Sequence, residues 1–252
     1  MKPDKIKVVY LRNPRVGSSA FISMLNALQR DGYIDTYYGT HQPLDRIEEK
    51  VFEDKGKQFW DSSVKVVSVR NPWDQHVSFF LKTRKSTQLG NDLHNIAKKF
   101  KTLSGHEQKA FINNFREVVS QQLKYIRGEV SDVYDADSLH CVKTGKFKNA
   151  VRNNLARLYK IDQIYVHEGK SVADYCIRME ECFLEKDLEQ FMKKINASMD
   201  YPHAQQYVAG AKRLNYDNPD HYNYQEFYDR KTIQAVREIR KLEIDLHGYK
   251  FK

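Results

Sequence analysis

A short apolar run, followed by a polar turn and then a helical pattern, constrains the fold of this chain more than any other feature. Residues Ile6 to Leu11 are apolar enough for a central strand of a parallel sheet. The segment from Ser18 to Arg30 has its apolar residues at helical spacing, namely Phe21, Leu25 and Leu28. We therefore expect a strand, a tight turn and a helix in direct succession.

The turn between this strand and this helix has the composition of an anion-binding loop. Gly17 allows the backbone to approach a ligand closely. Ser18 and Ser19 lie where the unpaired amides and the positive end of a helix point outward. The sequence therefore predicts a phosphate or a sulfate at this turn.

Further strand and helix patterns alternate along the chain. Strands are expected at Tyr33 to Tyr38, Val64 to Val69 and Val172 to Arg178. Helices are expected at Leu44 to Asp54, from about Trp73, at Phe183 to Ile195, and from Asp229 to Gly248. The inward residues of the last helix would be Ile233, Val236, Ile239 and Leu242. This alternation predicts an α/β fold with a central, doubly wound parallel sheet.

Residues 86–160 interrupt the alternation. The part from Ser86 to Arg127 is polar and helix-forming, with an inward stripe that includes Phe111, Phe115 and Val118. We expect a helical insertion over 86–160 that shapes the binding pocket of an acceptor. No Pro-, Gly- or Ser-rich linker divides the chain, so residues 1–252 are expected to form one domain.

Net charge and cysteine content limit the classes of ligand and the cellular compartment that we expect. With 42 Lys and Arg against 33 Asp and Glu, the net charge of +9 favours anionic ligands. The lysines are scattered, so no dedicated nucleic-acid surface is expected. The three cysteines, Cys141, Cys176 and Cys182, have neither disulfide-framework nor zinc spacing, which indicates a reducing compartment. With no signal-like or membrane-spanning apolar run, we expect a cytoplasmic protein without a membrane span.

Three expected strands end in polar groups, and ligands of parallel sheets bind beyond the carboxyl ends of the strands. The groups are Pro14 to Ser19, Thr40-His41, and Arg70 to Ser78. The first lacks the G-x-x-x-x-G-K-[ST] spacing of a P-loop, and no acidic strand end is evident that would hold Mg²⁺. A metal-dependent nucleotide hydrolase is therefore disfavoured, and no metal is expected.

The first and third groups resemble the cofactor motifs of sulfotransferases that use 3′-phosphoadenosine-5′-phosphosulfate (PAPS). The 5′-phosphosulfate loop of that family reads P-[KR]-x-G-[ST]-[ST], and Pro14 to Ser19 matches it, with Arg15 in the place usually held by Lys. A later strand of the family ends in R-[ND]-P and is followed by a Ser, as at Arg70 and Ser78. The similarity is closest to the compact carbohydrate-type and bacterial members.

Two further segments extend the resemblance over most of the chain. Tyr175 to Glu181, with Leu184 and Asp187-Leu188, is similar to the family's R-x-E-x-L segment. Tyr224 to Asp229 and Gly248-Tyr249-Lys250-Phe251 are similar to its terminal helix and G-Y-x-F tail. The resemblance implies a P-loop-NTPase-like three-layer fold with helical insertions.

The resemblance also implies a role for each motif residue. PAPS would be the co-substrate, and a hydroxyl or amine of a carbohydrate or small molecule the acceptor. His41 would be the general base and Arg15 the second catalytic residue, while Arg12 would reach toward the acceptor. Arg70 and Ser78 would hold the 3′-phosphate, with Lys212 and Arg213 as a basic lid. The loop that binds the phosphosulfate would comprise Arg15, Val16, Gly17, Ser18, Ser19 and Ala20.

Each of these residues also has a plain structural interpretation. Arg15, Arg70 and the pair Lys212-Arg213 can be solvated cations, and the serines can be helix caps or surface hydroxyls. His41 can be structural, in which case Glu48 or Glu49 is the alternative base. Trp73 is expected in the core rather than against an adenine ring. A P-loop nucleotide kinase and a non-catalytic nucleotide- or glycan-binding protein remain the alternative functions.

Overall fold

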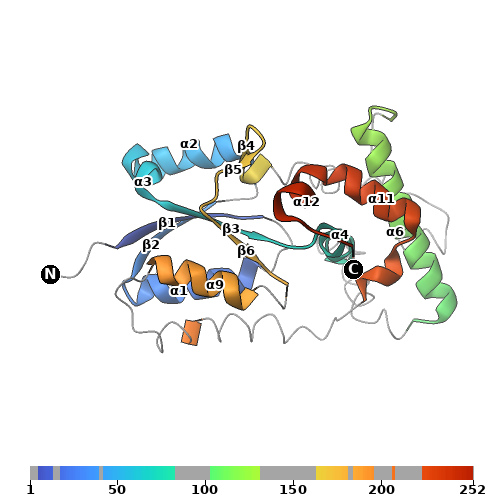
Figure 1. Ribbon diagram of the computed structural model, residues 1–252, viewed down its shortest axis with the longest axis horizontal. Helices are drawn as coiled ribbons and strands as arrows, with labels where there is room; N and C mark the ends of the chain where they lie inside the picture. The colour runs from blue at the N-terminus through green and yellow to red at the C-terminus, as the bar shows by residue number, and fades with distance from the viewer. Residues whose placement is uncertain are drawn as a thin grey trace, which may run out of the picture. The chain divides into compact units, whose positions relative to one another are not determined.

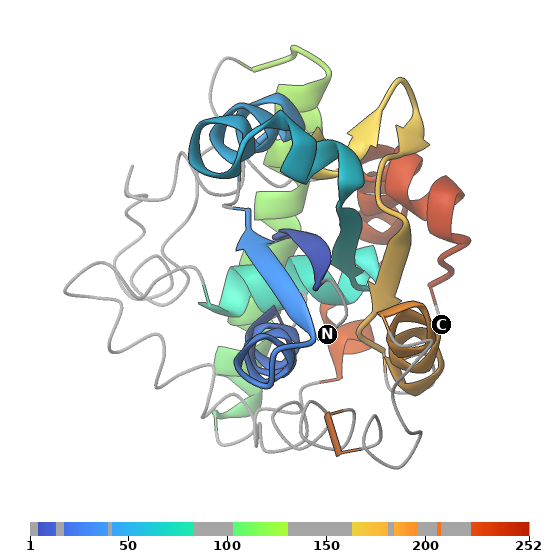
Figure 2. The same cartoon turned by 90° about the vertical axis from the view of Figure 1, so that its left-hand side faces the viewer.

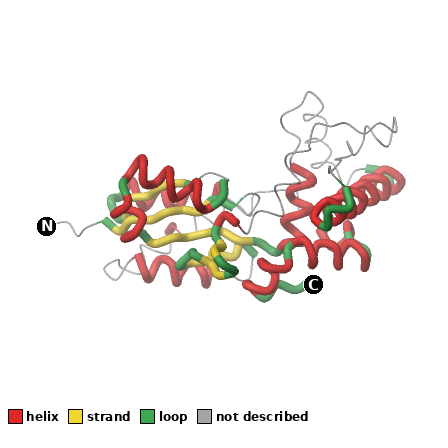
Figure 3. The backbone as a smooth tube through the Cα atoms, turned by 90° about the horizontal axis from the view of Figure 1, so that it is seen from above, coloured by secondary structure: helices red, strands yellow, loops and turns green. Residues whose placement is uncertain are grey.

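The computed structural model describes residues 5–13, 18–39, 42–82, 103–130, 163–180, 184–195, 206–207 and 223–251. The chain divides into two compact units. Unit 1 comprises Met1–Arg70 and Ile161–Asn218, and unit 2 comprises Asn71–Lys160 and Pro219–Lys252. The described strands, yellow in Figure 3, all belong to unit 1. The single domain expected for residues 1–252 stays a prediction, and the two units are described separately.

Unit 1 is built on a sheet of four parallel strands. The strands are β1 (Ile6–Leu11), β2 (Ile34–Tyr38), β3 (Val64–Val69) and β6 (Tyr175–Arg178), in the order β2-β1-β3-β6. In β1 and β3 the last four residues are fully or almost fully buried, because both faces of a parallel sheet are covered. The expected α/β class and parallel sheet are thereby confirmed.

Helices cover both faces of this sheet. Figures 1 and 2 show α1 (Ser18–Arg30) and α9 (Leu184–Ile195) on one face, and α2 (Leu44–Lys55) and α3 (Lys57–Ser62) on the other. The face under α1 and α9 holds the core cluster of Val8, Tyr10, Phe21, Met24, Leu25, Leu28, Ile34, Val66, Ile177, Leu188, Phe191 and Met192. This arrangement is compatible with a three-layer α/β fold.

A small hairpin that the sequence did not predict precedes β6. It pairs β4 (Val166–His167) with β5 (Lys170–Ser171) in antiparallel fashion. Glu168 and Gly169 connect the two at φ values of 49° and 77°, as a tight two-residue turn requires. The amide of Val172 donates to the carbonyl of Tyr165, so the segment after β5 stays with the hairpin, and β6 begins at Tyr175 rather than at Val172.

In its described part, unit 2 consists of helices. They are α4 (Pro72–Lys82), α6 (Gly105–Ile126), the short 3-10 helix η4 (Tyr224–Phe227), α11 (Arg230–Ile239) and α12 (Lys241–His247). Ser104 and Glu107 form a capping box that starts α6, which confirms a helix within the expected insertion. The rings of Phe111 and Phe115 on α6 pack against Phe80 of α4 at 5.1 and 5.4 Å.

The last helix is interrupted, contrary to the expectation of a continuous helix from Asp229 to Gly248. Arg240, at φ −114° and ψ 26°, separates α11 from α12. The break changes which residues face inward, so Leu242 is 37 % exposed while Glu243 and Ile244 are buried. The guanidinium of Arg240 is itself buried, donating to Gln75 Oε1 at 3.1 Å and pairing with Glu243. A buried charge pair thus takes a place where the apolar spacing predicted Leu242.

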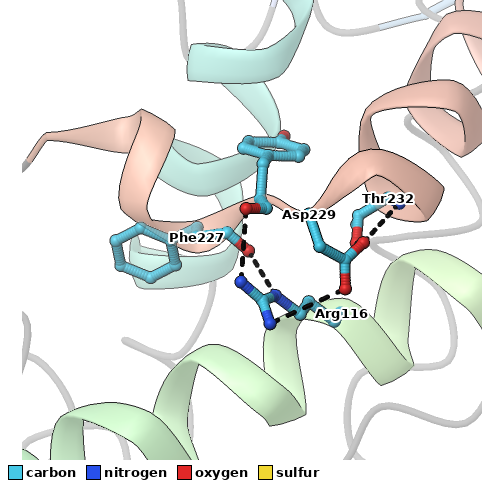
Figure 4. A network of polar contacts seen from close by, with 5 residues as sticks. Arg116, Phe227, Asp229 and Thr232 are labelled. Carbon is cyan, nitrogen blue, oxygen red and sulfur yellow. Dashed lines mark hydrogen bonds and ion pairs between the residues drawn. The ribbon is translucent and has the colours of Figure 1, made fainter.

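Arg116 of α6 links this helix to the segment before α11 (Figure 4). Its guanidinium donates to the carbonyl oxygens of Phe227 and Tyr228 at 3.0 and 3.2 Å and lies 3.6 Å from the Asp229 carboxylate. Asp229 caps α11 by accepting from the amide of Thr232 at 2.8 Å, as its sequence position predicted. Burial opposes ionisation of Asp229, but the hydrogen bonds from Thr232 and the charge of Arg116 outweigh it and lower the pKa of Asp229.

In the part of the chain that the structure describes, no helix is both long enough and apolar enough to cross a membrane.

Candidate functional site

The strand order of unit 1 places a topological switch point at the carboxyl end of β1. From β1 the chain moves to β2 on one side and then to β3 on the other. In parallel sheets the crevice outside the strands at such a point is where ligands bind. Leu11 of β1 is in register with Val67 of β3, so the polar residues that follow these two strands emerge from the same edge. The candidate site of unit 1 is this edge.

Two arginines follow the strands that flank the switch point. Arg12 directly follows β1 and Arg70 directly follows β3, and both side chains are half-buried. Asn13, beside Arg12, is fully buried. Because β1 and β3 are paired neighbours, two cationic groups that the sequence separates by 58 positions belong to one sheet edge. Such an edge suits an anionic ligand.

The first turn of α1 is held at this edge by aromatic packing. Tyr10 of β1 contacts Phe21 of α1 with ring centroids 5.0 Å apart, and Phe21 contacts Phe191 of α9 at 5.6 Å. The Tyr10 and Ser68 hydroxyls are hydrogen-bonded to each other at 2.8 Å, which connects β1 to β3 beneath the helix. The helix therefore starts at Ser18 with its amide end at the carboxyl edge of the sheet, an arrangement that favours anions.

The end of β2 lies against the end of β1. The amide of Gly39 donates to the carbonyl oxygen of Tyr10 at 2.9 Å. A Cβ at Gly39 would meet this oxygen at 3.0 Å and Ile47 of α2 at 3.2 Å, so a larger residue there would press against the backbone of β1. In the sequence, Gly39 is two residues before His41.

The carboxyl end of β6 is fixed by an ion pair. The backbone amide and Nε of Arg178 both donate to Asp187 Oδ2 at 2.9 Å, and its Nη2 donates to Oδ1 at 2.9 Å. The amide of Met179 donates to the carbonyl of Val69, so the chain after β6 continues beside the chain after β3. Glu180 therefore follows the sheet beside the Arg70 segment. The R-x-E-x-L pattern includes Glu180, but the sequence did not predict where it lies.

The predicted site residues other than Ser78 divide into three groups. Arg12 and Arg70 lie at the described edge of unit 1. Ser18, Ser19 and Ala20 begin α1, as predicted, and the structure describes their backbone only. The predictions for Arg15, Val16, Gly17, His41, Lys212 and Arg213 lie outside the described residues.

No family model matches the chain, and no curated protein or solved structure matches it either. The resemblance to PAPS-dependent sulfotransferases therefore rests on the sequence motifs alone.

Ser78, the last predicted site residue, belongs to α4 of unit 2. Its side chain is 2 % exposed, and Gln75, His76 and Val77 beside it are buried as well. In the structure the hydroxyl is thus enclosed by protein, and its contact with a 3′-phosphate stays a prediction from sequence. Trp73 lies in the core, as expected: it is 2 % exposed, and its Nε1 donates to the carbonyl of Ile233 at 3.1 Å.

His76 is a buried imidazole with a structural role in unit 2. Its Nδ1 lies 2.9 Å from the carbonyl oxygen of Pro72, which can only accept, so Nδ1 donates the proton. Burial, helped by the positive charge of Arg240, lowers the pKa of His76 to about 3. The ring is neutral at pH 7 and enclosed, which makes it a packing element rather than a general base.

Among the described residues, no group of three or more His, Cys, Asp or Glu side chains is placed to hold a metal ion.

Proposed function

We propose that this protein is a PAPS-dependent sulfotransferase. It would move the sulfuryl group of PAPS to a hydroxyl or amine of a carbohydrate or small-molecule acceptor and release adenosine 3′,5′-bisphosphate. The finer fold assignment, a P-loop-NTPase-like three-layer sheet, belongs to the same proposal.

The observation that carries the proposal is the parallel pairing of β1 with β3 at the switch point of the sheet. The 5′-phosphosulfate motif follows β1 in the sequence, and the R-[ND]-P motif follows β3. A nucleotide with a phosphosulfate at one end and a 3′-phosphate at the other would be held by two anion-binding segments, and these two motifs follow paired strands. The half-buried Arg12 and Arg70 agree with an anionic ligand at this edge.

The reaction would be an in-line displacement at sulfur. The acceptor oxygen or nitrogen forms a bond to sulfur while the bond from sulfur to the bridging oxygen of the 5′-phosphate breaks. His41 would take the acceptor proton, and Arg15 with the amides at the start of α1 would stabilise negative charge on the departing phosphate. Arg70 and Ser78 would hold the 3′-phosphate, and Arg12 would face the acceptor. The remaining contribution is orientation of the two substrates.

Arg15 departs from the usual lysine of this loop in a way that limits its role. Its guanidinium keeps the positive charge and offers a planar set of donors, but it does not give up a proton at neutral pH. It would therefore stabilise negative charge through its own charge and hydrogen bonds, and it would not act as a general acid.

Ligand-dependent thermal unfolding tests the nucleotide part of the proposal. Adenosine 3′,5′-bisphosphate without metal should raise the melting temperature, and ATP with Mg²⁺ should have a smaller effect. Stabilisation by ATP alone, with dependence on Mg²⁺, would instead favour a nucleotide kinase.

Transfer of labelled sulfate from PAPS to a panel of glycans, alcohols and amines tests the catalytic part. Turnover on one acceptor class identifies the substrate, and a His41→Ala variant that binds nucleotide but turns over slowly supports the base. Nucleotide binding with no transfer to any acceptor would point to a non-catalytic binding protein.

A further inference from the structure

We propose that the C-terminal tail, Gly248 to Phe251, is a positioning element for the first turn of α4, and through it for the residues that hold the 3′-phosphate of the nucleotide. This inference rests on the proposed function. It concerns contacts within unit 2, and it assigns to the tail a role in nucleotide affinity rather than in chemistry.

The tail is turned back by a left-handed residue at the end of α12. Gly248 has φ 66° and ψ 29°, and its amide and that of Tyr249 both donate to the carbonyl of Ile244. This is the αL geometry that ends helices and that favours glycine. It sets the direction in which Lys250 and Phe251 leave the helix.

Asn71 connects the tail to the start of α4 through both ends of one side-chain amide. Its Oδ1 accepts from the backbone amide of Trp73 at 3.1 Å and so caps the helix. Its Nδ2 donates to the carbonyl oxygen of Lys250 at 3.3 Å. Asn71 is 8 % exposed; its bond with Trp73 is buried, and its bond with Lys250 is partly buried. The same side chain thus fixes the beginning of α4 and the path of the tail.

Phe251 provides the apolar half of this connection. Its ring meets those of Trp73, Tyr228 and Tyr224 edge to face, with centroids 5.7, 5.3 and 5.8 Å apart. Aromatic pairs at such distances stabilise one another beyond the area they bury. The ring therefore packs against the first turn of α4 on one side and against η4 and the residue after it on the other.

Tyr228 completes the connection to α4. Its hydroxyl donates to the carbonyl oxygen of Trp73 at 2.8 Å in a buried position. Its own carbonyl accepts from Arg116, which anchors it to α6 (Figure 4). The first turn of α4 is thus held by the tail and by a tyrosine that a third helix keeps in place.

The contacts fall on Asn71 and Trp73, which lie in the sequence between the two residues predicted to hold the 3′-phosphate. Arg70 is bonded directly to Asn71, and Ser78 lies on α4 itself. Charge-assisted hydrogen bonds depend on the distance and angle between their partners, so displacement of the groups that hold the 3′-phosphate weakens its binding. Loosening of the tail should therefore weaken binding of the 3′-phosphate and leave the rate of the bound complex nearly unchanged.

The test compares Phe251→Ala and Asn71→Ser with wild type. Serine is a good helix cap but too short to reach Lys250 as asparagine does. We expect each variant to bind adenosine 3′,5′-bisphosphate about tenfold more weakly, with a raised KM for PAPS and a kcat close to wild type. Affinity for adenosine 5′-monophosphate, which lacks the 3′-phosphate, should change little. Phe251→Tyr should restore wild-type affinity because it keeps the ring.

Leu246→Ala is the matched control, because Leu246 is an apolar residue of α12 that is 36 % exposed. It should leave both nucleotide affinities unchanged. Circular dichroism melts identify any variant that unfolds at the assay temperature. If Phe251→Ala unfolds, Asn71→Ser, which keeps a helix cap, decides the test.

Two outcomes overturn the inference in distinguishable ways. If wild type binds the bisphosphate and the folded tail variants bind it equally well, the tail has no positioning role although the proposed function stands. If wild type itself does not bind the bisphosphate, the proposed function fails and the inference fails with it.

Discussion

Gly39 lies so close to Tyr10 that a Cβ on it would stand 3.0 Å from the Tyr10 carbonyl oxygen. The amide of Gly39 donates to that same oxygen, so the ends of β1 and β2 touch backbone to backbone. Ile47 of α2 occupies the remaining space, with two of its carbon atoms at 3.2 and 3.3 Å from the added Cβ. This contact fixes where the chain leaves β2 on its way to His41.

Replacing Gly39 by alanine should therefore destabilise unit 1. The methyl group would push against a backbone oxygen, so we expect a loss of about 1–3 kcal/mol in the free energy of unfolding, measured by urea titration. Gly105→Ala is the control, because a Cβ there meets no heavy atom within 4 Å and Gly105 begins a helix. That variant should be neutral or slightly more stable. Equal stability of both variants would contradict the close approach.

The Arg178–Asp187 pair should be a stability element of unit 1. Asp187 is 6 % exposed and accepts three hydrogen bonds from Arg178, so Asp187→Ala removes three charge-assisted bonds from a partly buried arginine. We expect Asp187→Ala to cost about 2–3 kcal/mol of unfolding free energy. Arg178→Leu in the Asp187→Ala background should restore part of the loss. A double-mutant cycle measures the coupling, and additive effects would show that the pair contributes little.

Arg70 should distinguish nucleotides by their 3′-phosphate. If it holds that group, Arg70→Ala should weaken adenosine 3′,5′-bisphosphate about ten- to a hundredfold, the range expected for lost charge-assisted hydrogen bonds. Affinity for adenosine 5′-monophosphate should stay within about twofold. Arg46→Ala, on the exposed surface of α2, is the control and should affect neither ligand. An equal loss for both nucleotides would assign Arg70 to another part of the ligand.

The strands and helices around the candidate site follow from local patterns in the sequence. Ile6–Leu11 and Ser18–Arg30 are bounded in the structure as the apolar spacing predicted, and so is Val64–Val69. The strand order does not follow from local patterns, because none of them indicates that β1 lies between β2 and β3. Arg12 and Arg70 follow neighbouring strands only because of that order. From the sequence, their convergence could be expected only from the rule that ligands of parallel sheets bind beyond the strand ends.

Two features that local patterns did not predict, the helix break at Arg240 and the β4–β5 hairpin, depend on interactions outside those patterns. The spacing of Val236, Ile239 and Leu242 predicts one continuous apolar face. The helix breaks at Arg240 because a buried guanidinium meets Gln75 of α4 and Glu243. The β4–β5 hairpin was missed for a related reason, since its strands are too short for a periodic pattern and its turn places Glu168 at a positive φ. Both depend on partners far away in sequence or on strained backbone.

The buried His76 should make unit 2 sensitive to acid above the range in which carboxylates titrate. In the unfolded chain a histidine has a pKa of about 6.5, whereas burial and Arg240 lower the pKa of folded His76 to about 3. Below pH 6.5 the unfolded state therefore binds a proton that the folded state does not. Stability is lost as the pH falls through this window and is fully present above it.

The loss attributable to His76 between pH 7.5 and 5.5 should be about 1 kcal/mol of unfolding free energy. His76→Gln keeps a donor for the Pro72 carbonyl but does not titrate, so the difference between the two pH values should shrink by that amount in urea titrations. His167→Gln is the control, because that side chain is 70 % exposed, and it should retain the wild-type dependence. An unchanged pH dependence in His76→Gln would mean that the imidazole reaches solvent and titrates normally in the folded protein.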